Sequence, residues 1–412
     1  MLTVSQAEEL ILKLAIPLDC KSDGEILDLL AARGRILATT VISDLDFPHW
    51  DNSAMDGYAV RYSDVQSCSA ETPVTLKVVA EIPAGEYPQQ SLQAGQAARI
   101  FTGAVMPPGA DTVVMQEDTC RTGNQVTIVT SPQPQAFVRQ QGAFYRAGHP
   151  LLPAGIRLGA AEIAVLAAAQ RDRVTVYRPL RVAILSTGNE LVPIGQPLQP
   201  GQIVDSNYYA LAALVAALGA RPVPLGIVPD QPAALRQAIQ TAVTEADVVL
   251  SSGGVSVGDY DYVEAVLAEL GGTLHIQAVA MKPGKPLTVA TFPGGDRPVL
   301  YFGLPGNPVS ALVTFYRLVQ PALAYLGGCP DWQPVFVRAR TRVDLRSDGK
   351  RETYLWGNLT LSKGEYEFTP ARGSHSSGNL INLAGTTGLA QIPVGTTNIS
   401  AGENIQVLKI NP

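Results

Sequence analysis

The chain has 412 residues, of which 46% are hydrophobic and 16% charged, with 30 basic and 36 acidic side chains and a net charge of −6. This length is enough for about three domains, each with its own core and without disulfide or metal staples. The low charged fraction and the negative balance argue against a disordered polyampholyte and against a generally basic nucleic-acid-binding protein.

The four cysteines and four histidines of the sequence are scattered. The cysteines form no CxxC pair, so neither a disulfide framework nor a zinc finger is indicated, and a reducing compartment is expected. The longest apolar stretch, around residues 210–220, is too short to span a bilayer, and the first residues lack a signal-peptide pattern. We therefore expect a soluble cytoplasmic protein without a membrane or nucleic-acid partner.

The beginning of the chain is predicted to be helical. Residues 4–15 and 22–38 have helical apolar spacing, and Ser5 and Ser22 are each followed three residues later by glutamate, as in a capping box. A helical pattern returns within residues 142–176.

A region of different character interrupts these helices. Residues 46–141 contain short β-rich runs separated by proline, glycine and asparagine, which is typical of a small all-β insertion. We expect a helical or mixed lead-in domain of residues 1–45 and 142–176, with a β-rich insertion domain at residues 46–141.

The second half of the chain follows two further patterns. Residues 177–328 alternate apolar strand-length runs with helices, and strands about 30 residues apart that are joined by helices form right-handed βαβ units. This predicts a three-layer α/β domain with a mostly parallel sheet. Residues 329–412 alternate strands with turns and predict a small, β-barrel-like C-terminal domain.

Ligands of open parallel sheets bind at the carboxyl ends of the strands, where loops offer free N–H groups. Four loops of the α/β domain follow strands and are expected to face one crevice: residues 186–190, 251–262, 282–286 and 304–308.

The loop after the strand at 248–252 combines hydroxyls with glycines. Ser251, Ser252 and Ser256 can donate hydrogen bonds, and Gly253 and Gly254 let the backbone approach an oxyanion closely. The loop has the character of a phosphate cradle; the alternative is a tight strand-to-helix connection.

Lys282 and Lys285 flank a Pro-Gly turn. Two ammonium groups held close together repel each other by roughly 1 kcal/mol even in water, so their pairing favours a bound oxyanion. The alternative is two solvated lysines on a turn.

Glu190, Asp259 and Asp261 lie in the same set of loops. Their carboxylates could hold Mg²⁺ or another divalent cation, because Mg²⁺ prefers oxygen ligands and keeps part of its water shell. The alternative role for Asp259 or Asp261 is that of a helix N-cap.

Other segments have unusual composition. Residues 51–60 and 101–111 are rich in turn-forming and polar side chains, which turn chemistry alone can explain. Arg338, Arg340 and Arg342 alternate and therefore share one strand face, for which a solvated surface is the default.

Nine motifs in a fixed order carry a resemblance over essentially the whole chain. They are DNSAMDGYAV, FTGA, VVMQED, STGNEL, SSGGVSVGDYDYV, MKPGKP, GLPGNPVSALVTF, KRETYLWG and GSHSSG. In these motifs the sequence resembles the molybdopterin molybdenumtransferases, a family that includes the bacterial MoeA proteins and the E-domain of gephyrin.

The resemblance implies an enzyme of molybdenum-cofactor synthesis. It would take adenylated molybdopterin and molybdate, hydrolyse the adenylyl group with a divalent cation, release AMP and transfer molybdenum to the pterin dithiolene. Family members are homodimers, and transient contacts with the upstream molybdopterin adenylyltransferase and with downstream molybdoenzymes are implied.

The resemblance also assigns roles to residues of this sequence. Catalytic roles are implied for Asp56, Thr102, Glu190, Asp261, Lys282 and Lys285. Substrate-binding roles are implied for Ser251, Ser252, Gly253, Gly254, Ser256, Pro286, Ser310, Arg351, Ser374 and Ser377. Asp56 or Thr102 and the region of Arg351 and Ser374 would come from the partner subunit, and Glu190, Asp259 and Asp261 would surround the cation.

Two departures from the family pattern stand out. The family usually has an acidic pair after the glycine at position 142, where this chain has Ala143 and Phe144. The loop after the first strand of the α/β domain has Asn189 where aspartate is common. A lower cation affinity, a moderated rate or loss of function could follow.

Two other functions fit the same sequence. One is a non-catalytic protein that binds the pterin or acts as a scaffold, which the missing acidic pair favours. The other is a nucleotide pyrophosphatase built on the same α/β domain. Release of AMP separates the transferase from the binder, and dependence on molybdate separates it from the pyrophosphatase.

Overall fold

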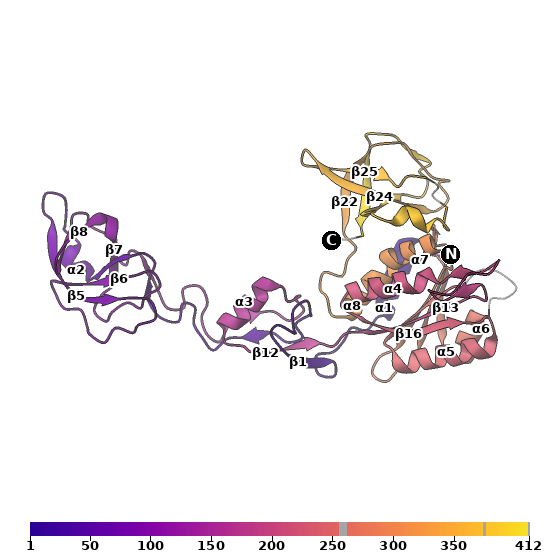
Figure 1. Cartoon of the computed structure of the whole chain (residues 1–412), viewed down its shortest axis with the longest axis horizontal. Coiled ribbons are helices and arrows are strands. Elements are labelled where there is room, and N and C mark those ends of the chain that lie inside the picture. Colours follow the sequence, from indigo (N-terminus) through magenta and orange to yellow (C-terminus); the bar gives the residue numbers. More distant parts are fainter. Residues whose placement is uncertain (255–261, 374–375, 411–412) are drawn as a thin grey trace. The chain divides into compact units, whose positions relative to one another are not determined.

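A computed structural model gives the fold of the chain and describes residues 1–254, 262–373 and 376–410. The chain divides into two compact units. The first unit comprises Met1–Thr39, Gly155–Ala160 and Arg173–Pro412, and the second unit comprises Thr40–Ala154 and Ala161–Asp172. Figure 1 follows the chain through both units.

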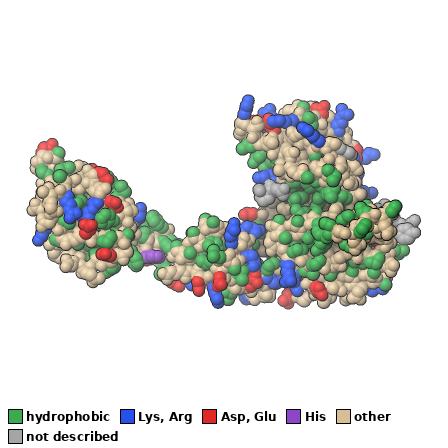
Figure 2. Space-filling model, viewed as in Figure 1, with side chains coloured by type: hydrophobic (Ala, Val, Ile, Leu, Met, Phe, Trp, Pro, Cys, Tyr) green, Lys and Arg blue, Asp and Glu red, His purple; other side chains and the backbone are tan. Residues whose placement is uncertain are grey.

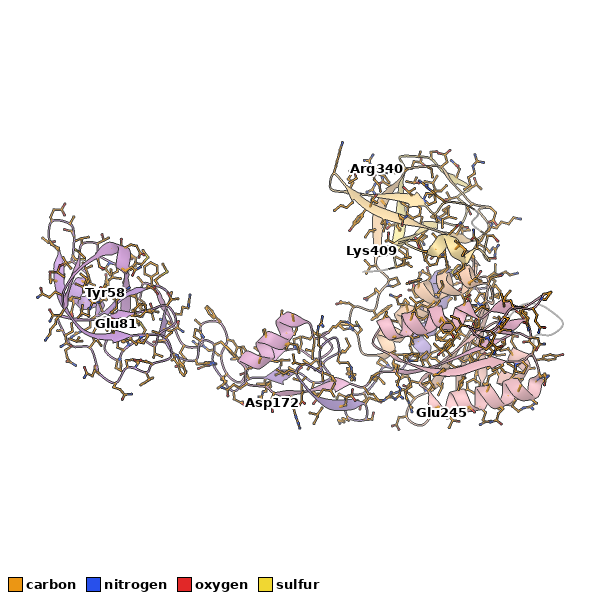
Figure 3. All side chains as sticks on the ribbon, in the orientation of Figure 1. Tyr58, Glu81, Asp172, Glu245, Arg340 and Lys409 are labelled. Carbon is orange, nitrogen blue, oxygen red and sulfur yellow. The ribbon has the colours of Figure 1, made fainter. Side chains whose placement is uncertain are left out.

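The second unit is built on a six-stranded sheet in which only β5 and β6 run parallel. In spatial order the strands are β7 (Thr112–Met115), β4 (Gly57–Val60), β6 (Gln96–Ile100), β5 (Val74–Ile82), β9 (Gln125–Ile128) and β8 (Thr119–Thr122). Figure 3 labels Tyr58 on β4 and Glu81 on β5. Successive side chains point to opposite faces, so Tyr58 and Ala59 enter two separate hydrophobic clusters. The predicted β-rich character of this region is confirmed.

Smaller elements complete the second unit. They are β2 (Val41–Ile42) with β11 (Pro150–Leu152), β3 (Asn52–Ser53) with β10 (Val138–Arg139), the short helices α2 (Tyr62–Val65) and η1 (Gln116–Asp118), and most of α3 (Ala160–Ala168).

The first unit contains the predicted α/β sheet. Its strands, in spatial order, are β16 (Arg221–Val228), β13 (Arg181–Thr187), β17 (Val248–Ser252), β21 (Val299–Leu304), β20 (Pro286–Phe292) and β18 (Thr273–Ala278). The first four run parallel, as predicted, and β20 and β18 are antiparallel additions. The connections around β20 are too short for the crossover helix that parallel pairing requires.

Helices cover both faces of this sheet. One face packs against α1 (Val4–Leu14), α4 (Ser206–Ala217), α7 (Pro308–Thr314) and α8 (Gln320–Leu326), and the other against α5 (Pro232–Glu245) and α6 (Val263–Glu269). In β13, Val182 and Ile184 enter the first cluster while Ala183 and Leu185 enter the second. Burial on both faces explains why this strand reads as a continuous apolar run.

A closed β-barrel ends the chain. Its strands, in ring order, are β24 (Glu352–Ser362), β25 (Glu365–Pro370), β22 (Phe336–Thr341), β28 (Asn404–Lys409) and β26 (Gly388–Ile392), and β26 pairs again with β24. Figure 3 labels Arg340 on β22 and Lys409 on β28. The accessory elements are β23 (Leu345–Arg346) paired with β27 (Asn398–Ile399), and the 3₁₀ helix η3 (Leu380–Leu383). The predicted barrel-like domain is confirmed.

Two predictions about helices were wrong in part. Residues 22–38 do not form a helix: β1 (Gly24–Asp28) pairs antiparallel with β12 (Arg173–Tyr177), and turns follow. A Cβ on Gly24 would lie 2.5 Å from the Cys20 carbonyl oxygen, a close approach that only glycine permits. The first helix begins after Thr3 rather than at Ser5, because Thr3 and Gln6 form the capping box.

The chain is helical from Pro308 to Leu326, but the helix is irregular. Between α7 and α8 the residues Phe315–Val319 form a π-helical turn (η2). By length and composition the stretch Pro308–Leu326 could cross a membrane, but 83% of it is buried inside the protein, as expected of a core helix. The remaining short strands are β14 (Leu191–Val192), β15 (Ile203–Val204) and β19 (Met281–Lys282).

Candidate functional site

Three of the four predicted loops, together with Pro286 at the end of the fourth, meet at one hollow of the first unit. A cavity of about 680 Å³, here called the strand-end cavity, lies at the carboxyl ends of β13, β17 and β21. Its polar, glycine and proline lining residues are Thr187, Gly188, Glu190, Asp205, Ser206, Asn207, Asp230, Ser252, Gly253, Gly254, Pro286, Pro305, Gly306, Asn307, Pro308 and Gly378. The prediction that these strand-end loops share a crevice is therefore confirmed for the loops at 186–190, 251–254 and 304–308.

The glycines of the Ser-Ser-Gly-Gly loop are required by its geometry. Gly253 and Gly254 have φ values of +92° and +65°. A Cβ on Gly253 would lie 2.4 Å from the carbonyl oxygen of Thr187, so the loop packs directly on the end of β13. The backbone is thereby brought to the cavity wall.

Hydrogen bonds join the loops of the strand-end cavity. The Asn207 amide donates to the Ser252 hydroxyl at 2.6 Å and to the Gly306 carbonyl at 2.8 Å. Ser251 is fully buried and accepts a hydrogen bond from the Tyr301 hydroxyl at 2.5 Å. Ser252, rather than Ser251, lines the cavity.

One hydroxyl at this wall is left without a partner. Thr187 lines the strand-end cavity, and its buried Oγ1 has no hydrogen-bond partner among the residues that the structure describes. A buried hydroxyl in this state costs free energy unless another group reaches it.

Acidic groups stand along the same cavity. Asp205 caps α4 by accepting from the Tyr208 N–H at 3.1 Å, and Glu190 lines the wall. The Asn189 N–H donates to the Asp230 carboxylate at 3.3 Å, and the Asn189 side-chain oxygen accepts from the Asp230 N–H at 3.2 Å. The carboxylate of Asp230 thus lies beside Asn189, the position at which aspartate is common in the family pattern.

The predicted cation ligands can be placed only in part. Glu190 lies at the strand-end cavity, whereas Asp259, Asp261 and also Ser256 lie outside the described residues. Within residues 1–254, 262–373 and 376–410, no three His, Cys, Asp or Glu side chains are grouped closely enough to hold a metal ion.

The fourth loop, at residues 282–286, borders a second cavity of about 730 Å³, here called the lysine cavity. It lies between this loop, the start of α7 and the barrel, and Pro286 lines both cavities. Its charged and hydrogen-bonding lining residues are Lys282, Lys285, Ser310, Asp344, Arg346, Ser347, Arg351, Thr353, Tyr354, Trp356, Ser376, Ser377, Asn379 and Asn382. Four cationic side chains against one carboxylate make this lining strongly positive.

The lysine loop is fixed to the barrel by its backbone. Strand β19 pairs parallel with β24, with Met281 opposite Glu352 and Lys282 opposite Thr353. The Arg351 guanidinium donates to the Met281 carbonyl at 3.3 Å. A Cβ on Gly284 would lie 2.6 Å from the Thr314 hydroxyl, so the turn also packs tightly on α7.

Lys282 has a partner of its own. Its ammonium group lies 3.0 Å from a carboxylate oxygen of Asp348, which stands in the turn before β24. The hydrogen bond from Lys282 is the main reason why the pKa of Asp348 is lowered, with a smaller contribution from Arg351. Asp348 is therefore ionised at neutral pH.

The segment after β25 supplies hydroxyls. Ser377 and Ser376 line the lysine cavity, and the Ser377 carbonyl accepts from the Val309 N–H at 3.1 Å, which places this segment against the start of α7. Ser310 is buried at the same wall. Ser374 lies outside the described residues.

Asp56 and Thr102 belong to the second unit, where they bond to each other. One carboxylate oxygen of Asp56 accepts from both the Thr102 N–H and the Thr102 hydroxyl, each at 2.8 Å. These two bonds lower the pKa of Asp56, and Arg99 adds to the effect. The Arg99 guanidinium lies over the rings of Tyr58 and Phe101.

Sequence reasoning missed several lining residues. Asp230 comes just after strand β16, and Asn207 lies in the first turn of α4. These positions in the sequence could have indicated that both residues lie at the carboxyl ends of the strands. Arg346 and Trp356 enter the lysine cavity only because the barrel packs on the helices that cover the α/β sheet, which local patterns do not predict. Figure 2 shows the basic side chains of the visible face in several separate groups.

Comparison with known proteins covers nearly the whole chain. The MoeA N-terminal region (domain I and II) matches residues 2–169, a probable molybdopterin binding domain matches residues 183–325, and the MoeA C-terminal region (domain IV) matches residues 338–410. The molybdopterin molybdenumtransferase of Nostoc sp. is 61% identical over 411 residues, covering 100% of this chain and 94% of the relative. That of Haemophilus influenzae is 37% identical and covers 100% and 99%.

A solved structure agrees with these matches. The molybdopterin biosynthesis MoeA protein from Pyrococcus horikoshii has a TM-score of 0.85 and 32% sequence identity, with 100% of both chains covered. The α/β domain, the barrel and the cavities between their loops thus define a transferase of molybdenum-cofactor biosynthesis. The chain belongs to the molybdopterin molybdenumtransferase family, and the resemblance of its motifs is confirmed.

Proposed function

We propose that the protein inserts molybdenum from molybdate into adenylated molybdopterin and hydrolyses the adenylyl group with a divalent cation, releasing AMP. It would act in the cytoplasm as a homodimer, in transient contact with the enzyme that adenylates the pterin and with the enzymes that receive the cofactor. The observation that carries the proposal is the pair of adjoining cavities with different chemistry, which share Pro286.

The lysine cavity suits molybdate, a tetrahedral dianion. Lys282, Lys285, Arg346 and Arg351 bring positive charge to it, and Ser310 brings a hydroxyl. The tight turn at Gly284 and the pairing of β19 with β24 hold the backbone of the lysine loop before the anion arrives. Groups that are already in place lose little conformational entropy when the anion binds.

The strand-end cavity suits the phosphates and the adenylyl group. Gly253 and Gly254 let the backbone approach a phosphate, and the Thr187 hydroxyl lacks a partner among the described residues. Because the two cavities adjoin, the pterin could place its sulfur atoms beside molybdate while its phosphate stays at the strand ends.

A divalent cation fits the chemistry of the strand-end cavity. Its wall offers the carboxylates of Glu190 and Asp230, and oxygen ligands with retained water are what Mg²⁺ prefers. Glu190 would hold the cation together with Asp259 and Asp261, which lie outside the described residues. Once bound, the ion would supply positive charge at the phosphate oxygens.

The residues of this chain then have distinct tasks. Water would cleave the phosphoanhydride to give AMP and the pterin phosphate, while Lys282 and Lys285 keep molybdate in place. Molybdenum would form two bonds to sulfur, and one molybdate oxygen would leave as water with the two thiol protons. Cationic donors that stabilise charge developing in such a step typically contribute about 3 kcal/mol each.

Lys285→Ala tests this proposal. With adenylated molybdopterin, molybdate and Mg²⁺, the variant is expected to form cofactor and release AMP about 10² to 10³ times more slowly than the wild type. Lys13→Ala, which removes an exposed lysine on α1, is the matched control and should keep full turnover. Equal rates of Lys285→Ala and wild type would refute the role of the lysine cavity, and AMP release without any molybdate dependence would favour a pyrophosphatase.

A further inference from the structure

We propose that Asp348 is an internal competitor of the oxyanion: its carboxylate holds Lys282 while the lysine cavity is empty and releases it when the anion enters. Asp348 would thereby set the affinity of the site for molybdate below the value that the cations alone would give. The inference rests on the proposed function of the lysine cavity and names a residue that tunes it.

The first support is the way in which the carboxylate is held. One oxygen of Asp348 accepts from the Lys350 N–H at 3.0 Å, and the other lies 3.0 Å from the Lys282 ammonium. The turn is fixed independently of Lys282, because the Ser347 N–H donates to the Thr397 carbonyl at 3.0 Å. The barrel therefore presents this carboxylate at a set position.

The second support is the difference between the two partners. Asp348 is short and tied to its own turn, whereas Lys282 carries its charge on four methylene groups, and 45% of its side chain is exposed. The ammonium group can exchange one acceptor for another with little backbone change. Lys282 lines the cavity, so the alternative acceptor is an anion inside it.

The third support is charge. A carboxylate beside the rim of the cavity repels an incoming dianion and occupies one of its cations at the same time. Both effects weaken anion binding, so removing the charge of Asp348 should strengthen it. If Asp348 instead served only to orient Lys282 toward the anion, its removal would weaken binding, and the sign of the change separates the two roles.

Asp348→Asn is the variant of choice, because the asparagine side-chain oxygen can still accept from the Lys350 N–H and preserve the turn. Molybdate binding to the full-length protein, measured by calorimetry at constant ionic strength, is expected to become roughly two- to fivefold tighter, the range for a partly exposed ion pair. Glu365→Gln is the matched control: it removes a carboxylate 3.0 Å from Arg340 on the same barrel and should leave the affinity unchanged.

A double-mutant cycle adds a second readout. Lys282→Ala should weaken molybdate binding more in the Asp348→Asn background than in the wild type, because Lys282 no longer has to leave Asp348 first. Unchanged or weaker binding in Asp348→Asn would overturn the inference while leaving the proposed function intact. If the wild type does not bind molybdate and Lys285→Ala changes nothing, the proposed oxyanion site itself fails, and the inference fails with it.

Discussion

At the scale of single residues, a buried charge connects the N-terminus of the chain to the wall of the lysine cavity. Arg317 is only 6% exposed; its guanidinium donates two hydrogen bonds to the Glu8 carboxylate, at 2.7 and 3.0 Å, and one to the Tyr354 hydroxyl at 2.9 Å. Tyr354 in turn donates to Glu352. Burial is the main cause of a strong rise in the pKa of Tyr354, so the phenol stays protonated. Helix α1, the η2 turn and strand β24 are joined by this chain of groups.

Tyr354→Phe should break this chain without creating a large cavity. The Arg317 guanidinium would lose an acceptor inside the core, and an unsatisfied buried donor costs about 1–3 kcal/mol. We expect the free energy of unfolding, measured in urea, to fall by about that amount. Tyr316→Phe is the control, since it removes the hydroxyl of another buried tyrosine in the same core cluster, one that makes no contact with Arg317 among the hydrogen bonds described above. Equal effects of the two substitutions would contradict the role of the Arg317 contact.

Individual site residues were predictable from sequence to different degrees. Gly253 and Gly254 could be predicted as a site of close backbone approach, but the same two glycines also fit a tight strand-to-helix connection, and only the structure shows them packed on the end of β13. The fixed position of Lys282 and Lys285 followed from the Pro-Gly turn. Asp348 carried no local signal, because its contact with Lys282 depends on the pairing of β19 with β24, about 70 residues away in the sequence. Asp259, Asp261, Ser256 and Ser374 stay predictions.

At the scale of elements, ion pairs fix the junction between the α/β sheet and the β1–β12 pair. Asp23, just before β1, accepts from Arg178 at 2.9 Å and pairs with Arg297 in the connection between β20 and β21. Arg178 also binds Asp247 through two hydrogen bonds, at 2.7 and 2.8 Å. Four segments that are far apart in the sequence are thus held at the end of the sheet opposite to the strand-end cavity.

The junction should weaken in acid. Burial alone would raise the pKa of Asp23, but its pairs with Arg297 and Arg178 and its hydrogen bond from the Asp19 N–H outweigh this and lower the pKa to about 2. A lowered carboxyl pKa gives stability that is fully present above the unfolded pKa of 3.8 and is lost as the pH falls toward 2.

Urea unfolding at several pH values measures this effect. Asp23→Asn should be less stable than the wild type at pH 7, and the difference should shrink steadily between pH 4 and pH 2. Asp296→Asn, an exposed position on the neighbouring connection, should show little difference at any pH. A deficit of Asp23→Asn that stays constant down to pH 2 would contradict the ion-pair explanation.

The elements themselves were predicted well where their apolar pattern was long. The parallel strands, their covering helices and the terminal barrel all followed from periodicity. The strand β1 was mistaken for a helix because its serine and glutamate matched a capping box, although Gly24 and the pairing with β12 decide its conformation. This pairing joins residues about 150 positions apart, so it cannot be predicted from the sequence of either short segment alone.

At the scale of the whole molecule, the resemblance predicts that each site draws on two subunits. Asp56 and Thr102 belong to the second unit, and both cavities belong to the first unit. The same prediction assigned Arg351 to the partner subunit, but the structure places Arg351 at the lysine cavity of its own chain, because β19 pairs with β24. A homodimer could bring the second unit of one subunit to the cavities of its partner. Sequence patterns alone could not predict this, because they describe one chain at a time.

Mixing two inactive variants tests the shared site. When equal amounts of the Asp56→Ala and Lys285→Ala chains exchange subunits, mixed dimers should make up about half of all dimers. If each site takes Asp56 from one subunit and Lys285 from the other, every mixed dimer keeps one intact site, and about a quarter of wild-type turnover should return. No recovery, with mixed dimers demonstrated by mass spectrometry, would show that both residues act within one chain.

The central claim is that the lysine cavity receives molybdate, and the most direct measurement is the position of molybdenum in crystals soaked with molybdate, located by its anomalous scattering. We expect a single strong peak at a position that places the molybdate oxygens within hydrogen-bonding distance of the Lys285 ammonium and the Arg351 guanidinium. A peak confined to the strand-end cavity, or no bound molybdenum at concentrations that support turnover, would contradict the claim.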